Sequence, residues 1–211
     1  MLKIAVPKGV LFEPSLRLLK NCGYKIPSDF GRKLLIEDSN QQLSLVIVRP
    51  FDMPLYVEEG VVDVAFIGKD VIEETSMSCF EILDLGYGQC RLSVAVPGFS
   101  PYRSVEDFHS FIKVGSKYQN LSKKFFIEKG IQVRIFPLGG SVELSPIVGL
   151  SDAIIDLVST GNTLKANNLV EIETILFSTS RLVVNDAKYR LKRKEINEFI
   201  LRVKEVLNDI Y

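Results

Sequence analysis

Short apolar runs rich in branched residues alternate with amphipathic segments along the whole chain. The first run, Leu2 to Val6, ends at Pro7-Lys8-Gly9, and the apolar residues after it share one helical face until Gly23. Because strands and helices that alternate in sequence usually form layers, the pattern predicts an α/β fold with a largely parallel sheet. Further strands are predicted at 33–37, 43–48, 62–67, 80–85, 91–96, 113–115, 132–136, 153–158 and 181–184.

Helices complete the predicted layers. They are expected at 54–59, 120–129 and 142–148, with another in the C-terminal segment. In that segment apolar residues recur at spacings of three and four, namely Ile196, Phe199, Ile200, Val203, Val206, Leu207 and Ile210. The polar stretch 97–106 indicates a boundary between two lobes, and 177–181 is a candidate for a second crossing that returns the last helix to the first lobe.

Charge and cysteine content argue against several classes of protein. In 211 residues, 26 Lys and Arg balance 26 Asp and Glu, so no overall field draws the chain to nucleic acid or to an anionic membrane. The three cysteines, Cys22, Cys79 and Cys90, form no Cys-x-x-Cys pair, which argues against a disulfide framework and a thiolate zinc site. With no signal peptide and no apolar run of membrane-spanning length, we expect a cytoplasmic protein.

His109 is the only histidine in the chain. It stands in the polar stretch Asp107-Phe108-His109-Ser110, which indicates an exposed connection. A Ser-His-Asp or Cys-His catalytic arrangement, or a His-rich metal centre, would have to be built on this one residue. We therefore expect any chemistry here to proceed without an imidazole.

Two segments of the sequence echo each other. Residues 60–68 and 149–157 both have Gly-x-x-Asp followed by a buried strand that opens into a polar loop. Such an echo favours two similar lobes, each bringing one strand end to a shared cleft, where open α/β sheets bind ligands. Because Gly-x-x-Asp before a strand is also ordinary turn chemistry, the echo alone leaves both interpretations open.

The most informative stretch runs from Asp156 to Leu164. An apolar strand ends with an acid, passes through Ser159-Thr160-Gly161-Asn162-Thr163 and enters a helix. Backbone amides at a helix N-terminus, a glycine that permits close approach and two threonine hydroxyls suit a phosphate monoester, and Asp156 is placed to accept from the hydroxyls of an attached ribose. A plain turn with a helix cap is the alternative, but the acid at the strand end favours the phosphate cradle.

Cationic turns elsewhere indicate a second anionic group on the ligand. Lys8 and the amide of Gly9 follow the first strand, and Arg32, Lys33 and Arg49 stand at the edges of predicted strands. Each cation by itself is most often a solvated surface charge. Together with the threonine loop, these turns suggest a ligand with phosphates at two ends.

A resemblance to a known family covers the whole chain. It begins at 4–9 and is densest at 140–169, with further matches at 32–34, 52–58, 64–71, 83–86, 90–92, 116–121 and 180–185. On these motifs the chain resembles the catalytic subunit of ATP phosphoribosyltransferase, the first enzyme of histidine biosynthesis, in the short form that lacks a C-terminal regulatory domain.

The resemblance implies a fold and a reaction. The fold would have two lobes like those of type II periplasmic binding proteins, with a cleft between them. We expect the first α/β lobe at 1–90 plus 178–211, and the second, with the phosphoribosyl diphosphate loop, at 91–177. The implied reaction joins N1 of the adenine of ATP to the anomeric carbon of phosphoribosyl diphosphate and releases diphosphate, with Mg²⁺ present.

By position, the resemblance also implies a role for each matching residue. The 5-phosphate would bind at 160–163, and Asp156 would take ribose hydroxyls. Lys8, Arg32 and Lys33 would face diphosphate or the phosphates of ATP. The implied catalytic residues are Lys8, Arg32, Lys33 and Glu143. The implied substrate-binding residues are Gly9, Arg49, Asp156, Ser159, Thr160, Gly161, Asn162 and Thr163. Asp156 and Glu143 are the candidates for holding magnesium, and the choice between them stays open.

The first loop departs from the family pattern. The family usually has Lys-Gly-Arg where this chain has Lys8-Gly9-Val10. Loss of that guanidinium weakens stabilisation of the leaving diphosphate, because a charged hydrogen bond is worth about 1.5–3 kcal/mol. Either Arg49 or a residue of a partner compensates, or the isolated chain is a slow catalyst.

The short form further implies a homodimer that assembles with a regulatory subunit resembling histidyl-tRNA synthetase, through which histidine inhibits. Two other functions stay open at this point. One is a small-molecule sensor of the periplasmic-binding type, or a paralogue of the enzyme that has lost its activity. The other is a phosphoribosyltransferase whose loop has two consecutive acids before Thr-Gly, and Ile155, which precedes Asp156, counts against it.

Overall fold

The computed structural model describes residues 1–27, 29 and 31–210. It divides the chain into two compact units, the first made of residues up to Gly88 and from Thr179 onward, and the second made of Gln89–Ser178. The lobes expected from sequence ended at residues 90 and 177. Residues 28, 30 and 211 of the expected first lobe, and the side chain of Ile210 in the expected helical stripe, lie outside what the structure describes.

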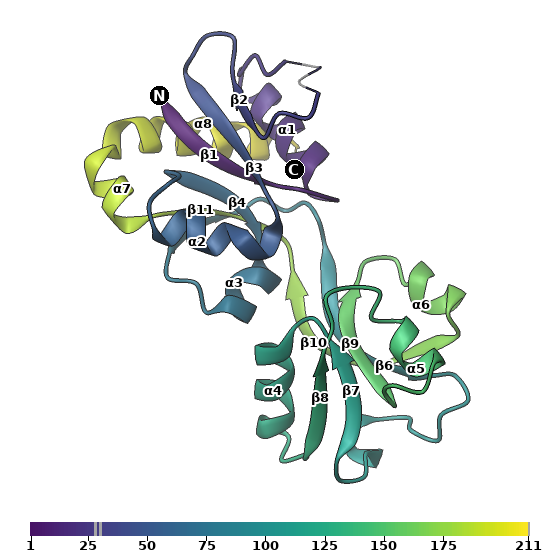
Figure 1. Cartoon of the computed structure of the whole chain (residues 1–211). Helices are drawn as coiled ribbons and strands as arrows, with labels where there is room; N and C mark the ends of the chain where they lie inside the picture. The colour runs from purple at the N-terminus through teal and green to yellow at the C-terminus, as the bar shows by residue number, and fades with distance from the viewer. Residues whose placement is uncertain (28, 30, 211) are drawn as a thin grey trace. The chain divides into compact units, whose positions relative to one another are not determined.

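The first unit is a six-stranded sheet with helices on both faces (Figure 1). The sheet has the order β2-β3-β1-β4-β11-β5. Its strands are β1 (Leu2–Pro7), β2 (Leu35–Glu37), β3 (Leu43–Val48), β4 (Val64–Gly68), β5 (Phe80–Asp84) and β11 (Ser180–Val184). Its helices are α1 (Phe12–Asn21), η1 (Pro50–Asp52), α2 (Met53–Glu58), α3 (Lys69–Thr75), α7 (Asp186–Leu191) and α8 (Arg193–Ile210).

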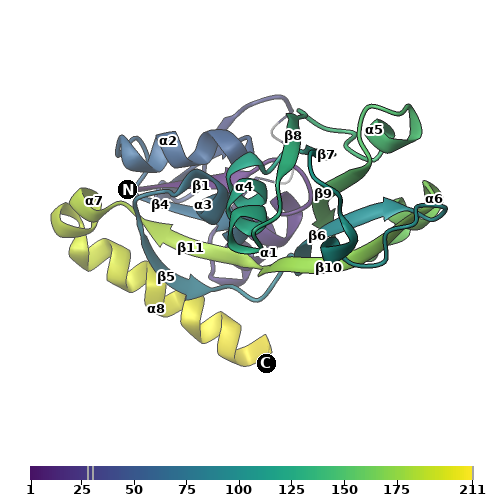
Figure 2. The same cartoon turned by 90° about the horizontal axis from the view of Figure 1, so that it is seen from below.

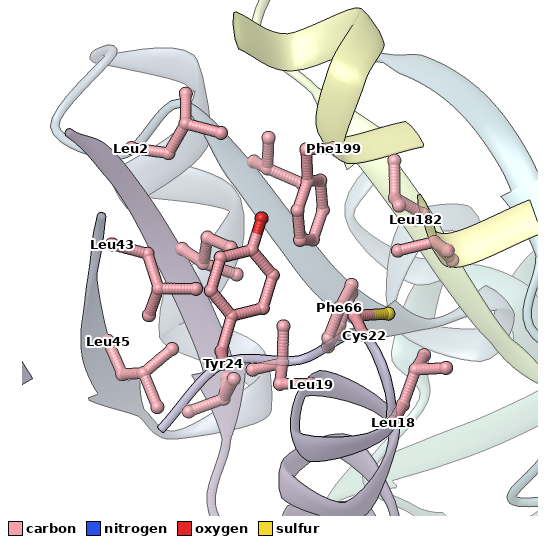
Figure 3. Close-up of a cluster of buried hydrophobic side chains, with 14 of the residues drawn as sticks. Leu2, Leu18, Leu19, Cys22, Tyr24, Leu43, Leu45, Phe66, Leu182 and Phe199 are labelled. Carbon is pink, nitrogen blue, oxygen red and sulfur yellow. The ribbon is translucent and has the colours of Figure 1, made fainter. Parts of the chain in front are cut away.

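Strand β4 is apolar throughout because both of its faces are covered. Val64 and Phe66 belong to the cluster formed with α1 and α8, in which Phe66 and Phe199 stack with ring centroids 6.3 Å apart (Figure 3). Ala65 and Ile67 point to the opposite cluster, formed with α2 and α3. A central strand buried on two faces reads as a continuous apolar run rather than an alternating one.

The second unit is a five-stranded sheet with the order β10-β6-β9-β7-β8 (Figure 2). Its strands are β6 (Cys90–Pro97), β7 (Ile112–Ser116), β8 (Val133–Pro137), β9 (Ala153–Val158) and β10 (Leu169–Ser178). Its helices are η2 (Val105–Asp107), α4 (Gln119–Glu128), α5 (Leu144–Ile147) and α6 (Asn162–Ala166). One buried cluster joins Val142, Ile154, Val158 and Leu164, so α6 is packed against the strand that precedes it.

The prediction of a largely parallel sheet is wrong. Among the described residues, four strand pairs are parallel and five are antiparallel. In the second unit β6 runs antiparallel to β9 and to β10, and in the first β11 runs antiparallel to β4 and β5. Each of these pairs includes a strand that flanks one of the two crossings between units, namely β5, β6, β10 or β11. The spacing of residues in the sequence holds no information on the direction of these strands.

Some elements were not expected from the sequence. The largest is β10, ten residues long, whose alternation is broken where its register with β6 shifts between Glu171 and Glu173 and between Thr174 and Leu176. The short helices α3 and α7 were also missed. Their apolar residues cover too few turns to show a helical period.

The sequence echo corresponds to a repeated structural detail. In the first unit the carboxylate of Asp63 accepts from the amide of Lys3 at 2.8 Å, and the Asp63 amide donates to the Lys3 carbonyl at 2.9 Å. In the second unit Asp152 and Lys113 make the same reciprocal pair, at 2.9 and 2.8 Å. Both aspartates begin a strand that pairs in parallel with the strand holding the lysine, so the repeat interpretation is confirmed for this part of the two units.

The cysteines and the histidine are not arranged as a disulfide or as a catalytic pair in the described part of the chain. The three cysteines form no disulfide with one another, and burial raises the pKa of Cys22 and of Cys79 to about 11. His109 is exposed, as expected, and its Nδ1 lies 3.0 Å from the carbonyl oxygen of Ser110. Among the described residues, no helix combines the length and apolar character needed to cross a membrane.

Candidate functional site

The threonine loop follows the C-terminal end of β9. This strand lies between β6, with Arg91 opposite Val158, and β7, with Ser116 opposite Ile155. After Val158 the chain turns through Ser159 and Thr160 to Gly161, whose φ of +78° is the left-handed conformation that glycine adopts at no steric cost. The turn therefore depends on Gly161, because a residue with a side chain would be strained in this conformation.

Several backbone amides of this loop have no acceptor in the described part of the chain. They are those of Ser159, Thr160, Gly161 and Thr163; by contrast, the Asn162 amide lies 3.4 Å from the Thr160 hydroxyl oxygen. The predicted helix N-terminus is only the five-residue α6, so its dipole contributes little. The donors belong to the loop itself, and successive amides in such a turn form a concavity suited to an anion.

All the site residues predicted in the second unit line one cavity of about 150 Å³. The polar ones are Glu143, Asp156, Ser159, Thr160, Gly161, Asn162 and Thr163, and Leu157, Val158 and Leu164 complete the wall. Ser159, Thr160, Asn162 and Thr163 are exposed, so a ligand can reach them from solvent. The volume suits a phosphate and part of a sugar.

Asp156 is a perturbed acid at the inner edge of this cavity. Burial raises the pKa of its carboxyl, and the nearby charge of Glu143 adds to the rise, to about 6. The hydrogen bond from the Leu157 amide at 2.8 Å and the charge of Lys117 act in the opposite direction. Above pH 6 the group is an ionised, acceptor-only carboxylate held in a partly desolvated place.

Three of the predicted cations line a separate cavity in the first unit. Lys8, Arg32 and Lys33 surround about 300 Å³ together with Phe12, Gly31, Leu34 and Ile47. Arg32 and Lys33 precede β2, which begins only at Leu35, so the strand predicted from 33 starts two residues late. The three side chains are exposed and make no ion pair with any described residue, which leaves their charges available to an anion.

Two predicted residues of the first unit lie beside this cavity without lining it. Gly9 follows Lys8 with φ +94°, and Arg49 precedes η1 at the end of β3, the strand that pairs with β1 up to Pro7 and Val48. The Lys8 amide donates to the Val48 carbonyl at 2.8 Å, which ties the two turns together. Val10, where the family usually has arginine, is 91% exposed and contributes no charge.

Sequence reasoning missed one charged neighbour of the second cavity. Lys117 acts on Asp156 from the turn after β7, 39 residues earlier in the chain. Lys117 stands in a segment that carries the family resemblance, but its effect on Asp156 follows only from the pairing of β7 with β9. The available signal was a lysine two residues after the strand predicted at 113–115.

The comparisons with known proteins agree over the whole chain. The family model for ATP phosphoribosyltransferase matches residues 49–205. ATP phosphoribosyltransferase from Halalkalibacterium halodurans is 43% identical over 209 residues, which cover 98% of this chain and 97% of that protein. The enzyme of the same name from Shouchella clausii is 45% identical over 208 residues, with coverage of 98% and 95%.

Solved structures show the same relationship. A chain of the ATP phosphoribosyl transferase (HisG:HisZ) complex from Thermotoga maritima superposes with a TM-score of 0.86 at 35% identity, covering 99% of this chain and 100% of that one. The periplasmic aliphatic sulphonate binding protein SsuA from Escherichia coli superposes at 0.64 with 14% identity, covering 98% and 68%. The second likeness shows the fold alone and confirms the type II periplasmic-binding-protein-like architecture. The chain is thus a member of the ATP phosphoribosyltransferase family.

Proposed function

We propose that this chain transfers the phosphoribosyl group of phosphoribosyl diphosphate to N1 of ATP and releases diphosphate, the first step of histidine biosynthesis. The observation that carries this proposal is the loop from Asp156 to Thr163, which combines unpaired amides, two threonine hydroxyls and a carboxylate around one cavity. The amides and hydroxyls suit the 5-phosphate, and the carboxylate suits the ribose hydroxyls. The family membership supports the identity of the sugar donor.

The proposed reaction fits a site without an imidazole. Adenine N1 has a free lone pair and no proton, so its attack on the anomeric carbon requires no general base. As the N1–C1 bond forms, the bond from C1 to the diphosphate oxygen breaks and the electron pair leaves with diphosphate. The barrier lies in separating that charge, which calls for cations on the leaving group and a fixed ribose.

Lys8, Arg32 and Lys33 are the residues we propose for the leaving diphosphate or the phosphates of ATP. They line one cavity, they are exposed, and no described carboxylate neutralises them. A second observation favours a polyanion here, namely a fourth positive charge nearby. The Lys8 amide donates to the carbonyl of Val48 at the end of β3, and Arg49 is the next residue. Four positive charges on adjoining turns suit a group with several negative charges.

The donor set also fits Mg²⁺ bound with the substrate. Among the described residues, no group of three or more His, Cys, Asp or Glu side chains could form a metal cage. Magnesium usually binds one or two carboxylates together with substrate phosphates and water, and Asp156 and Glu143 line the same cavity. We propose that Asp156 and Glu143 hold Mg²⁺, which when bound would neutralise charge on the diphosphate.

The proposal extends to assembly and location. The Thermotoga maritima relative was solved as a HisG:HisZ complex. We propose that this chain likewise forms a homodimer and assembles with a regulatory subunit resembling histidyl-tRNA synthetase, through which histidine inhibits. We propose further that it acts in the cytoplasm.

One assay tests the function directly. Purified chain is mixed with ATP, phosphoribosyl diphosphate and Mg²⁺, with a diphosphatase to pull the equilibrium, and the absorbance of N1-alkylated adenine is followed. Growth of that band supports the enzyme. Tight binding of phosphoribosyl diphosphate without turnover, even with a regulatory subunit added, contradicts it.

The loop hydroxyls give a first prediction. Thr160→Ala and Thr163→Ala each remove one donor to the 5-phosphate, so we expect KM for phosphoribosyl diphosphate to rise roughly tenfold to hundredfold, the equivalent of one charged hydrogen bond. Ser110→Ala is the control, because this exposed residue precedes β7. Since β7 and β9 run parallel, Ser110 lies near the starts of these strands and the loop follows their ends. Unchanged saturation in both threonine variants would remove the phosphate role from the loop.

Position 10 gives a second prediction. Val10 is 91% exposed, so Val10→Arg adds a guanidinium beside Lys8 with no loss of packing. We expect kcat to rise up to about tenfold if the missing cation limits departure of diphosphate. Val61→Arg, at another exposed apolar position of the same unit, controls for a general effect of charge. An equal rate in the wild-type and Val10→Arg chains would mean that another cation already performs this role.

A further inference from the structure

The carboxylate of Asp156 lies in unfavourable surroundings, and ribose binding requires it to keep one orientation. It is partly buried, and the nearest acid, Glu143, lines the same cavity, so the two negative charges repel each other. A carboxylate that accepts from ribose hydroxyls must also present its oxygens in one direction. The hydrogen bond from the Leu157 amide to Oδ1, at 2.8 Å, holds only one of the two oxygens.

The register of β7 and β9 brings the turn that holds Lys117 to the end of β9 that holds Asp156. Strands β7 and β9 run parallel, with Val114 opposite Ala153 and Ser116 opposite Ile155. In this pairing Lys117 follows the last paired residue of β7, and Asp156 follows that of β9. Continuing the register sets the two residues opposite each other with their side chains on the same face. The charge of Lys117 lowers the pKa of the Asp156 carboxyl, which agrees with this placement.

The turn that carries Lys117 is fixed on both sides. Ser116 is fully buried, and its hydroxyl donates to the Ile155 carbonyl at 2.8 Å while accepting from the Tyr118 amide at 2.9 Å. Tyr118 is 4% exposed and precedes α4. Lys117 stands between these two buried residues and is itself half-buried. A lysine held this way loses less conformational freedom when its ammonium takes a fixed place.

No other described element brings a cation to Asp156. On the other side of β9 the opposing residue is Ser93, whose hydroxyl donates to Glu171 at 3.1 Å. Glu171 is engaged by Arg91 through two contacts of 2.6 and 2.7 Å, so that guanidinium is already committed. Lys117 is therefore the group able to balance the charge of Asp156 and Glu143.

We propose that Lys117 is a positioning residue that orients the Asp156 carboxylate toward the ribose hydroxyls and so helps the site to select ribose. This inference rests on the function proposed above. It assigns the lysine no contact with the phosphate, which the loop amides and threonines bind. Loss of the ammonium should therefore weaken recognition of the sugar hydroxyls more than recognition of the phosphate.

Two small ligands separate these contributions. Ribose 5-phosphate and 2-deoxyribose 5-phosphate share the phosphate and differ by one hydroxyl, and calorimetry measures the binding of each to the full chain without turnover. For the wild-type chain we expect ribose 5-phosphate to bind about tenfold more tightly, because a site built to pair a hydroxyl rejects the analogue without it. In Lys117→Met we expect this preference to fall severalfold, with the affinity for 2-deoxyribose 5-phosphate nearly unchanged.

Two further variants make the result specific. Lys117→Arg keeps a cation at the turn and should restore most of the preference. Lys113→Met removes an exposed lysine from β7, the strand that precedes Lys117, and should leave the preference as in the wild type. A general loosening of the unit would instead lower the affinity for both ligands equally, and that result would overturn the positioning role.

The outcomes distinguish this inference from the proposed function. If the wild-type chain prefers ribose 5-phosphate and Lys117→Met keeps the full preference, the role of Lys117 is wrong while the loop assignment stands. If the wild-type chain binds neither ligand, or binds both equally, the assignment of the loop to a phosphorylated ribose is itself wrong. In turnover assays the proposal requires KM for phosphoribosyl diphosphate to rise in Lys117→Met more than kcat falls.

Discussion

Asp156→Asn is expected to lower kcat/KM for phosphoribosyl diphosphate about 100-fold or more while making the folded chain more stable at pH 8. The carboxylate accepts from the ribose hydroxyls in the proposed complex, and replacing it with an amide removes charged hydrogen bonds worth about 1.5–3 kcal/mol each. The amide oxygen still accepts from the Leu157 amide, so the local fold is kept.

The gain in stability follows from the direction of the pKa shift. In the unfolded chain the Asp156 carboxyl has an ordinary pKa of 3.8, whereas burial raises the folded value to about 6. A raised folded pKa gives stability that is fully present below pH 3.8 and is lost as the pH rises through 6. Above pH 7 the ionised carboxylate therefore destabilises the fold, by about 3 kcal/mol.

Urea unfolding at pH 4 and pH 8, in buffer without divalent cations, measures this prediction. The Asn variant should be more stable than the wild type at pH 8, and the difference should shrink toward pH 4. Glu128→Gln, an exposed acid on α4, is the matched control and should change neither stability nor KM. A variant that keeps wild-type kcat/KM would exclude Asp156 from ribose binding.

The second-unit loop was predictable because it is local in sequence. Asp156 and residues 159–163 lie within eight residues of the chain. A strand with an acid near its end, followed by a Thr-Gly turn, keeps these groups together in any parallel or mixed sheet. Glu143 required more, since only the packing of Val142 against Ile154 and Val158 brings its segment to the loop. There the family resemblance supplied what periodicity did not.

Pairing between distant strands was not predictable in the same way. The charge of Lys117 acts on Asp156 because β7 and β9 are neighbours in register, and their local sequences would be the same in another strand order. The antiparallel direction of β10 and β11 was unpredictable for a similar reason. Their direction is set by where the chain crosses between units, after Gly88 and after Ser178, which no local propensity encodes.

The repeated Gly-x-x-Asp motif was ambiguous in sequence for a physical reason. Each aspartate begins a strand with a turn that would be favourable in any loop. What makes the motif structural is the partner strand, which offers the amide of Lys3 to Asp63 and that of Lys113 to Asp152. The two sites differ in burial and charge, and this difference leads to a test.

Asp63→Ala is expected to lower the free energy of unfolding by about 3 kcal/mol, because it removes one member of a buried ion pair. Asp63 is 2% exposed, and one oxygen accepts both from the Lys3 amide and from the Lys192 ammonium at 2.8 Å. Lys192 joins α7 to α8, so the variant also releases the C-terminal helix from the start of the sheet. For a chain of this length the loss corresponds to roughly 10 °C in Tm.

Asp152→Ala is the control that the repeat provides. Among the described residues its exposed carboxylate accepts only from the Lys113 amide and meets no lysine ammonium, so we expect a loss of only about 1 kcal/mol. Thermal unfolding followed by circular dichroism compares the two variants. Lys192→Met should reproduce much of the Asp63→Ala effect, because it leaves the same carboxylate buried without its cation. Equal losses in Asp63→Ala and Asp152→Ala would show that the shared turn, rather than the ion pair to α8, determines the stability of these strands.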